Sequence, residues 1–477
     1  MRLVHGRMAA VLVARQSDDC EALFDHFRGA GEAALAAAQA ALAAGKASAA
    51  LAFDRAATFH RHALELAPAD RRVPVWREAL ADALANAARP AEAAVEYLRA
   101  AEDASPSRRV ELQRRAAEQF LTGGHIDEGL ALIRRVLSSV GVSFATTPRM
   151  AAVRLIWRRV RLWGRGLTFA PRAPADIDDA TLMRLDTCWA AGAGLALVDV
   201  VSACDFIAQH LHMALDAGEV SRVARGVALE SSARNADWPF RRSATRMARL
   251  SSTLAEGVGT PQARATDLLA DSISANAMGQ WARARSSSQA ALTLLRDECV
   301  GVTWEINIAQ NMLIWALMYL GEFTDVSRRV PALLADARRR GNLYLATEIC
   351  TRSNIVWLTA DQPEEGEREA LEAMSRWSQK GFHRQHYSLR LVRAQTALYR
   401  GDPAAAWRAL REQEAGLRRS MLLQVQAFRV ESSYLRARCA LANAAAGPAD
   451  RRFLKVARAS ARRIARERMP WSDPLGL

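Results

Sequence analysis

Residues 315–326, Trp-Ala-Leu-Met-Tyr-Leu-Gly-Glu-Phe-Thr-Asp-Val, decide the fold class. Apolar side chains crowd the part before Gly321, and Phe323 and Val326 continue with helical spacing after it. A helix ends readily at glycine, because glycine adopts the left-handed backbone conformation without steric cost. The stretch therefore predicts two antiparallel helices joined at Gly321, each covering the apolar stripe of the other.

The same turn recurs along the chain at nearly constant intervals. Its copies lie at 279, 321, 361 and 401, in Met278-Gly-Gln-Trp, Leu320-Gly-Glu-Phe, Ala360-Asp-Gln-Pro and Arg400-Gly-Asp-Pro. The intervals are 42, 40 and 40 residues, and upstream the segments 84–94 and 120–130 align 36 residues apart. Tetratricopeptide units have about 34 residues and HEAT-type units about 40 to 47. We therefore predict an all-α protein, an α-solenoid of antiparallel, tetratricopeptide-like helical hairpins with a period of about 36–42 residues.

The composition agrees with a long helical array. The chain has 477 residues, of which 50% are hydrophobic and only 6% aromatic. Ala, Leu, Arg and Glu, which favour helices, are abundant, whereas β-branched Ile and Thr are sparse. A Pro- and acid-rich connection at 168–180 interrupts the pattern, which predicts one helical subarray at 1–167 and a second at 181–477. The second is expected to be truncated within a hairpin, since Met469-Pro-Trp-Ser-Asp-Pro begins a new helix that soon stops.

Several motifs in the chain resemble a known family. They include His5-Gly-Arg-Met-Ala, Leu51-Ala-Phe-Asp-Arg-Ala-Ala, Gly301-Val-Thr-Trp-Glu and Gly381-Phe-His-Arg-Gln-His-Tyr, and the similarity covers nearly all of the sequence. The chain resembles the tetratricopeptide-like C-terminal region of large bacterial, myxobacterial-type serine/threonine protein kinases. In those proteins a kinase domain and a P-loop signal-transduction ATPase precede the helical region. The resemblance implies a regulatory or sensory role in signalling, with a kinase or ATPase as partner.

Motifs for catalysis are missing from the sequence. It has no Gly-rich kinase loop, no His-Arg-Asp followed by Asn, no Asp-Phe-Gly and no GxxxxGK[ST] phosphate loop. The kinase and ATPase domains of the similar proteins are thus absent here, and we expect no enzymatic activity and no cofactor. His383 and His386 have an i, i+3 spacing that could place two metal ligands on one helix face. No third ligand is evident beside them, so no metal site is predicted.

Basic residues carry the main alternative hypothesis. The formal net charge is +14, spread over the whole length, which permits association with polyanions. Two predicted helices have a basic face opposite an apolar one. The first basic face consists of Arg154, Arg158, Arg161 and Arg165, opposite Val153, Ile156, Trp157, Val160 and Trp163, and the second consists of Arg451, Lys455, Arg458, Arg462 and Arg466. Such faces either bind phosphate backbones or anionic lipid, or simply cover the solenoid with their long side-chain stems.

Cysteine usage and hydropathy indicate the compartment and the class of partner. The six cysteines include no CxxC pair, which is typical of reduced thiols in the cytoplasm. No segment reaches the roughly 18–20 consecutive apolar residues that a transmembrane helix needs. We therefore predict a cytoplasmic, non-catalytic module that binds a protein on the concave surface formed by the first helices of successive hairpins. Nucleic-acid binding is the alternative, and self-association through the unfinished C-terminal hairpin is a further hypothesis.

Overall fold

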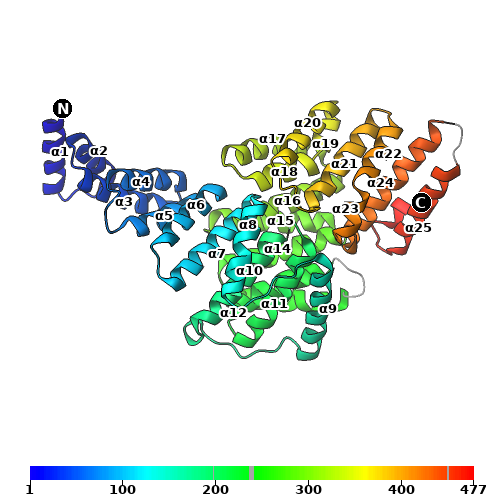
Figure 1. The fold of residues 1–477 in the computed structure, drawn as a ribbon, viewed down its shortest axis with the longest axis horizontal. Coiled ribbons are helices and arrows are strands. Elements are labelled where there is room, and N and C mark those ends of the chain that lie inside the picture. Colours follow the sequence, from blue (N-terminus) through cyan, green and yellow to red (C-terminus); the bar gives the residue numbers. More distant parts are fainter. Residues whose placement is uncertain (197, 236–240, 448–450, 477) are drawn as a thin grey trace. The chain divides into compact units, whose positions relative to one another are not determined.

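The computed structural model describes residues 1–196, 198–235, 241–447 and 451–476, and within these ranges it contains 25 α-helices and no β-strand (Figure 1). Most helices that follow one another in the chain pack against one another. The predicted all-α helical-repeat solenoid is confirmed. No helix in the described ranges combines the length and the apolar character that crossing a bilayer requires.

The chain divides into two compact units. Unit 1 comprises residues 1–123, 128–136 and 340–342, and unit 2 comprises residues 124–127, 137–339 and 343–477. The helices of unit 1 are α1 (Arg2–Ala14), α2 (Cys20–Ala30), α3 (Ala33–Ala49), α4 (Phe53–Leu66), α5 (Val73–Asn86), α6 (Pro90–Glu102) and α7 (Pro106–Gly123), and α8 (Ile126–Ser139) has residues in both units.

The core of unit 1 is built largely from alanine. Ala36 and Ala40 of α3 and Ala63 of α4 are fully buried, and they pack with Phe24 and Trp76 in one cluster. A methyl side chain lets two helices approach closely, so the small residues set the spacing and the aromatic rings fill the remaining volume.

Unit 2 begins with long helices and continues as regular hairpins. The first helices are α9 (Pro148–Arg165), α10 (Asp179–Leu195), α11 (Val200–Ala217), α12 (Val220–Asn235) and α13 (Arg241–Val258), and the connection at 168–180 contains the short 3-10 helix η1 (Pro174–Asp176). The hairpins are α14 (Pro261–Ala277) with α15 (Trp281–Asp297), α16 (Thr303–Leu320) with α17 (Phe323–Arg339), α18 (Leu343–Arg352) and α19 (Ile355–Thr359) with α20 (Pro363–Ser375), α21 (Arg384–Tyr399) with α22 (Pro403–Glu412), and α24 (Gln426–Ala445) with α25 (Arg451–Arg466). The short elements α23 (Glu414–Arg419) and η3 (Leu422–Gln424) lead into α24.

The turns lie where the sequence predicts them. The residues at the four turns all have positive φ, with angles of 74° at Gly279, 76° at Gly321, 57° at Asp361 and 73° at Gly401. Upstream, Ala88 and Gly124 occupy equivalent places with φ of 58° and 91°. At the last turn Asp402 caps the next helix, since its Oδ1 accepts a hydrogen bond from the backbone N–H of Ala405 at 2.8 Å. The predicted hairpin period is therefore confirmed by the backbone.

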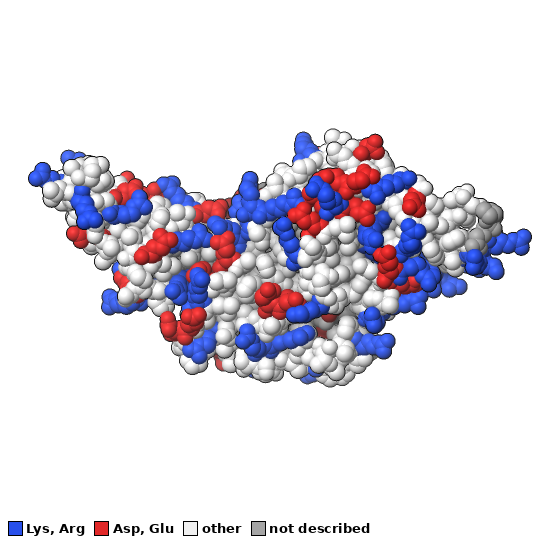
Figure 2. Space-filling model, turned by 45° about the horizontal axis from the view of Figure 1, so that its top comes forward, with Lys and Arg blue, Asp and Glu red and all other residues white. Residues whose placement is uncertain are grey.

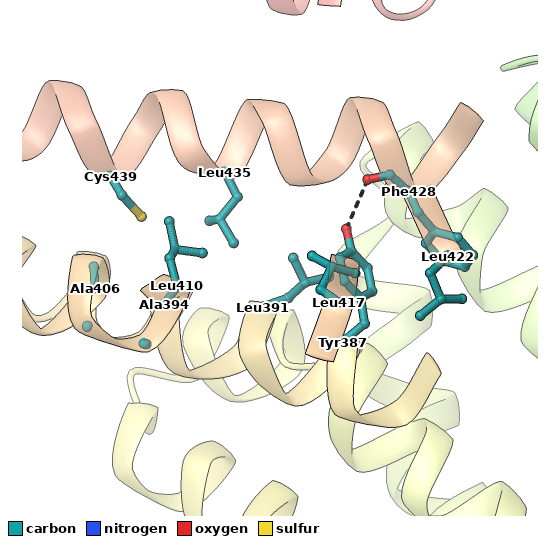
Figure 3. Packing of buried hydrophobic residues seen from close by; sticks show 12 residues of the cluster. Tyr387, Leu391, Ala394, Ala406, Leu410, Leu417, Leu422, Phe428, Leu435 and Cys439 are labelled. Carbon is teal, nitrogen blue, oxygen red and sulfur yellow. Dashed lines mark hydrogen bonds between the residues drawn. The ribbon is translucent and has the colours of Figure 1, made fainter. Parts of the chain in front are cut away.

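The hairpin of α21 and α22 shows how the apolar stripes pack together. Tyr387 and Leu391 of α21, Leu410 of α22 and Leu435 of α24 are buried in one cluster (Figure 3). The Tyr387 hydroxyl lies 3.5 Å from the carbonyl oxygen of Phe428 and 2.9 Å from the Glu431 carboxylate, and its single proton is shared between these two acceptors. Truncating a leucine in such a cluster to alanine costs about 2–5 kcal/mol, so each hairpin depends on its neighbour.

The C-terminal segment differs from the prediction. The sequence predicts a further helix from Met469, but the segment 469–476 forms a turn followed by the short 3-10 helix η4 (Asp473–Gly476), which packs on α25. Pro474 has no N–H to donate to the carbonyl oxygen of Pro470, as an α-helix through this segment would require. Met469 and Ser472 are fully buried, so the segment is part of the packed structure of unit 2.

Candidate interaction groove

The first helices of four successive hairpins line a groove in unit 2. Helices α16, α18 with α19, α21 and α24 all contribute side chains to a cavity of about 720 Å³. Ligand pockets in proteins are typically about 300–1,000 Å³. The walls are largely apolar and aromatic, and they include Tyr319, Phe323, Leu391, Tyr399 and Tyr434. The groove can therefore accept apolar side chains of considerable size.

One cation in the groove lining is neutralised by a carboxylate of the same unit. Arg352 of α18 lies 3.0 Å from the carboxylate of Glu431 on α24, and the Tyr387 hydroxyl donates to the same carboxylate at 2.9 Å. The Arg352 guanidinium also lies over the ring of Trp315, 4.7 Å from its centroid. Burial alone would lower the pKa of Arg352, but the attraction of Glu431 outweighs this effect and raises it. Arg352 therefore remains charged and serves to join α18 to α24.

Arg438 is a different kind of cation in the groove. It is exposed, its guanidinium lies 5.7 Å from the ring centroid of Tyr434, and it forms no ion pair within the described ranges. Because its charge is not compensated by the surrounding protein, it favours a ligand that carries a carboxylate or another anion. The groove thus combines an aromatic wall with a cation free to bind.

A second buried ion pair holds α18 against α21. The Arg384 guanidinium pairs with the Glu348 carboxylate, and both side chains are almost completely buried. Gln385 donates to the same carboxylate at 3.5 Å. Burial alone would lower the pKa of Arg384, whereas the Glu348 carboxylate raises it, and the net effect is a rise. Buried pairs of this kind fix the register of the helices that form the groove.

The C-terminal segment inserts an aromatic side chain into the groove lining. Trp471 meets the rings of Trp281 and Tyr319 edge to face, with ring centroids 6.1 and 6.2 Å apart, and it lines the groove together with Leu475. Trp281 and Tyr319 are themselves stacked, with centroids 4.7 Å apart and an interplanar angle of 5°. Such aromatic contacts add about 0.5–1.5 kcal/mol to the burial of the rings. The segment 469–476 therefore forms part of the groove wall through Trp471 and Leu475.

Gly279 makes room for this indole. Its φ of 74° favours glycine, and a Cβ atom built there would lie 2.6 Å from the Trp471 side chain. The turn residue between α14 and α15 thus meets two requirements, one of backbone conformation and one of space. The corresponding Gly401 has nothing within 4 Å of such a Cβ atom, so it meets only the first.

His383 and His386 are structural residues of the α21 start. The Trp377 indole N–H donates to Nδ1 of His383 at 3.1 Å, and the His383 backbone N–H donates to Nδ1 of His386 at 3.1 Å. Burial lowers the pKa of each histidine to about 4. Both are therefore neutral near pH 7 and accept hydrogen bonds that cap the helix. Among the residues that the structure describes, no group of three His, Cys, Asp or Glu side chains is arranged to hold a metal ion.

The predicted basic face of α9 is largely turned toward its neighbouring helix. Arg158 pairs with Asp205 and donates to Gln209 of α11 at 2.7 Å. Arg165 lies 2.9 Å from Asp216. Of the remaining two, Arg154 donates to the Ser143 carbonyl oxygen at 3.1 Å and Arg161 lies over the ring of Trp157. These contacts hold α9 in place, and the predicted set does not form a continuous free surface.

The basic face of α25 is exposed to solvent. None of its five predicted cations forms an ion pair within the described part of the chain, and Figure 2 shows Lys and Arg side chains at the end of unit 2 where α25 lies. The five are Arg451, Lys455, Arg458, Arg462 and Arg466. This face is the available surface for a polyanion.

Sequence reasoning missed the aromatic cluster around Trp471. Trp281 and Tyr319 each lie close to a turn, but nothing in the local pattern links them to a tryptophan far along the chain. Known proteins give no further guide to this cluster, since no family model and no curated protein matches the chain.

Proposed function

We propose that this chain is a non-catalytic helical-repeat module that binds a short segment of another protein in the groove of unit 2. The observation that carries the proposal is the position of Trp471, an indole that packs against Tyr319 in the groove lining. Aromatic side chains in well-packed pockets supply much of the binding energy of protein interfaces. The chain's own segment therefore indicates which chemistry the groove accepts.

The preferred partner segment carries an aromatic residue and an acidic one. The wall of tyrosine and phenylalanine rings favours an aromatic or large apolar side chain. Arg438, exposed and without an ion pair in the described ranges, favours a nearby carboxylate. The internal segment has the same character, since Asp473 follows Trp471 closely.

The biological setting of the proposal rests on the sequence resemblance. By that resemblance the module is a regulatory or sensory region of bacterial signalling, located in the cytoplasm, and its partner is a kinase or ATPase. The described fold supports this setting only in being a helical-repeat array, an architecture widely used to present extended binding surfaces.

A peptide experiment tests the proposal. A labelled peptide with the sequence of residues 469–476 is titrated into the full chain carrying Trp471→Ala, and binding is followed by fluorescence anisotropy. We expect the peptide to bind this variant and to bind the wild type at least about tenfold more weakly, because the wild-type segment competes at a high effective concentration. A peptide in which alanine replaces the tryptophan is the control. Equal binding of the two peptides, or no binding of either, contradicts the proposal.

Polyanion binding by α25 is the second candidate function. It is favoured by the five exposed cations of this helix, which have no ion-pair partner in the described ranges. A nucleic-acid complex formed there would weaken steeply with salt, because bound counterions are released from the phosphates. We expect Arg458→Glu with Arg462→Glu to abolish binding of duplex DNA or RNA, with Arg71→Glu in unit 1 as control. Equal affinities of the two proteins would exclude α25 as the site.

Self-association is a third candidate, and the structure suggests its form. If the segment 469–476 leaves its own groove, it can bind in the groove of a second copy. The resulting dimer would be domain-swapped, with each protomer supplying this segment to the other. Light scattering at increasing concentration tests this: dimers formed by the wild type but not by Trp471→Ala support the exchange. A wild type that stays monomeric contradicts it.

A further inference from the structure

Helix α9 exposes its apolar face. Large side chains at i, i+3, i+4, i+7 and i+10 lie on one side of the helix, and all are well exposed to solvent. The exposed fractions are 67% for Val153, 64% for Ile156, 59% for Trp157, 61% for Val160 and 85% for Trp163. These five side chains form the α9 apolar stripe. Contiguous apolar surface of this kind on a folded protein marks an interaction site.

The polar side of α9 holds the helix in this orientation. Arg158 pairs with Asp205, and Arg159 lies 2.9 Å from Glu230, whose side chain is completely buried. The Arg158 carbonyl oxygen also accepts a hydrogen bond from Nε2 of His212 at 2.9 Å. Turning the helix to bury the apolar stripe would leave the buried Asp205 carboxylate without its cation and would leave Glu230 with Arg234 alone. The exposure of the stripe is therefore built into the packing of unit 2.

The charge of α9 indicates the chemistry of what covers the stripe. The helix contains six arginines and no acidic residue. Arg158, Arg159 and Arg165 are neutralised by carboxylates of unit 2, whereas Arg149 and Arg161 are exposed and form no ion pair within the described ranges. In a dimer formed through this face, Arg149 and Arg161 of one copy would lie near the same arginines of the other copy, and the like charges would repel each other. An anionic counterpart is favoured instead.

The shape and residue types point to a lipid surface. The stripe follows one face of a single helix, which is about 27 Å long. A flat layer can therefore cover all five side chains at once. Tryptophan favours the boundary between headgroups and acyl chains, and arginine pairs with lipid phosphates. We propose that α9 docks unit 2 on an anionic membrane surface, lying in the plane of the interface with the apolar stripe inserted.

Vesicle sedimentation tests the proposal with the full chain. Vesicles of phosphatidylcholine alone are compared with vesicles that also contain phosphatidylserine. We expect binding to the anionic vesicles and a loss of about tenfold or more for the double variant Trp157→Ser with Trp163→Ser. Val153→Ser is expected to weaken binding, whereas Val75→Ser, which replaces an equally exposed valine of unit 1, leaves it unchanged. Equal sedimentation of the wild type and the double variant would overturn the proposal.

Two further measurements distinguish insertion of the stripe into lipid from self-association and from loss of folding. Lipids brominated on their acyl chains quench nearby indoles, so they should quench the fluorescence of the wild type more than that of the double variant. The double variant should melt at the wild-type temperature, because the replaced side chains lie outside the core. A wild type that is dimeric without lipid and becomes monomeric in the double variant would show that a second copy covers the stripe, and would overturn the proposal.

Discussion

The indole of Trp471 meets the phenol ring of Tyr319 edge to face, with centroids 6.2 Å apart, although the two residues are more than 150 positions apart in the chain. Tyr319 belongs to the first helix of a hairpin, and Trp471 belongs to the segment that follows α25. The contact places the C-terminal segment in the lining of the groove.

Gly279→Ala is expected to destabilise unit 2 more than Gly401→Ala does. Both substitutions force alanine into a left-handed conformation, at about 1–2 kcal/mol. Only at Gly279 does the new methyl group also meet the Trp471 side chain. Urea denaturation should show the difference, and it should disappear when each substitution is made separately in a Trp471→Gly background, because Cβ of Trp471 is itself one of the atoms that the new methyl group meets. A difference that persists in that background would show that Trp471 is not its cause.

Glu348→Gln is expected to cost about 3–5 kcal/mol in the free energy of unfolding, because it leaves the buried Arg384 without its carboxylate. The matched control is Glu365→Gln, which breaks the exposed pair with Arg368. Exposed pairs contribute about 0–1 kcal/mol. Chemical denaturation of both variants tests this contrast. Similar losses in the two would mean that the buried pair does not hold α18 to α21.

Unit 2 is expected to lose stability as the pH falls from 7 to 5, in part through His383. Burial lowers the pKa of this histidine from 6.5 to about 4. Between these two values the unfolded chain binds the proton and the folded chain does not, so the stabilisation is present above pH 6.5 and is lost as the pH falls toward 4. From pH 7 to pH 5 the wild type should lose about 2 kcal/mol more than His383→Asn does.

The comparison of these two proteins by urea denaturation isolates the histidine from other acid-sensitive groups. Asparagine keeps an acceptor for the Trp377 indole N–H but cannot gain the proton. His62→Asn in unit 1 is the control and should leave the pH dependence of unit 2 unchanged. The same pH dependence in the wild type and His383→Asn would contradict the assignment.

The fold could be predicted from the sequence because its signals are local. Gly321 and Gly401 end helices within a few residues of the apolar stripes that they separate, and the backbone bears this out with positive φ at both. Whether the α9 apolar stripe is buried or exposed could not be predicted in this way. Amphipathic spacing shows which face of a helix is apolar, but Asp205 and Glu230, which decide which face is covered, lie 47 and 71 residues from their arginines.

The groove could be predicted from the sequence only in part. Its walls come from helices spaced about one repeat apart, so the concave surface could be expected from the repeat period. The position of Trp471 could not, because it depends on packing between segments that are distant in the chain. The α25 cations were found from sequence because a basic helix face is itself a local pattern.

Site-specific photo-crosslinking in a lysate of the native cells tests the central claim most directly. A photoreactive amino acid replaces Tyr399, at the exposed edge of the groove, or Val75, which is exposed in unit 1. We predict that position 399 captures a discrete protein, that position 75 does not, and that the peptide of residues 469–476 added to the lysate prevents the capture. Capture of the same proteins from both positions, or of none from position 399, would contradict the account.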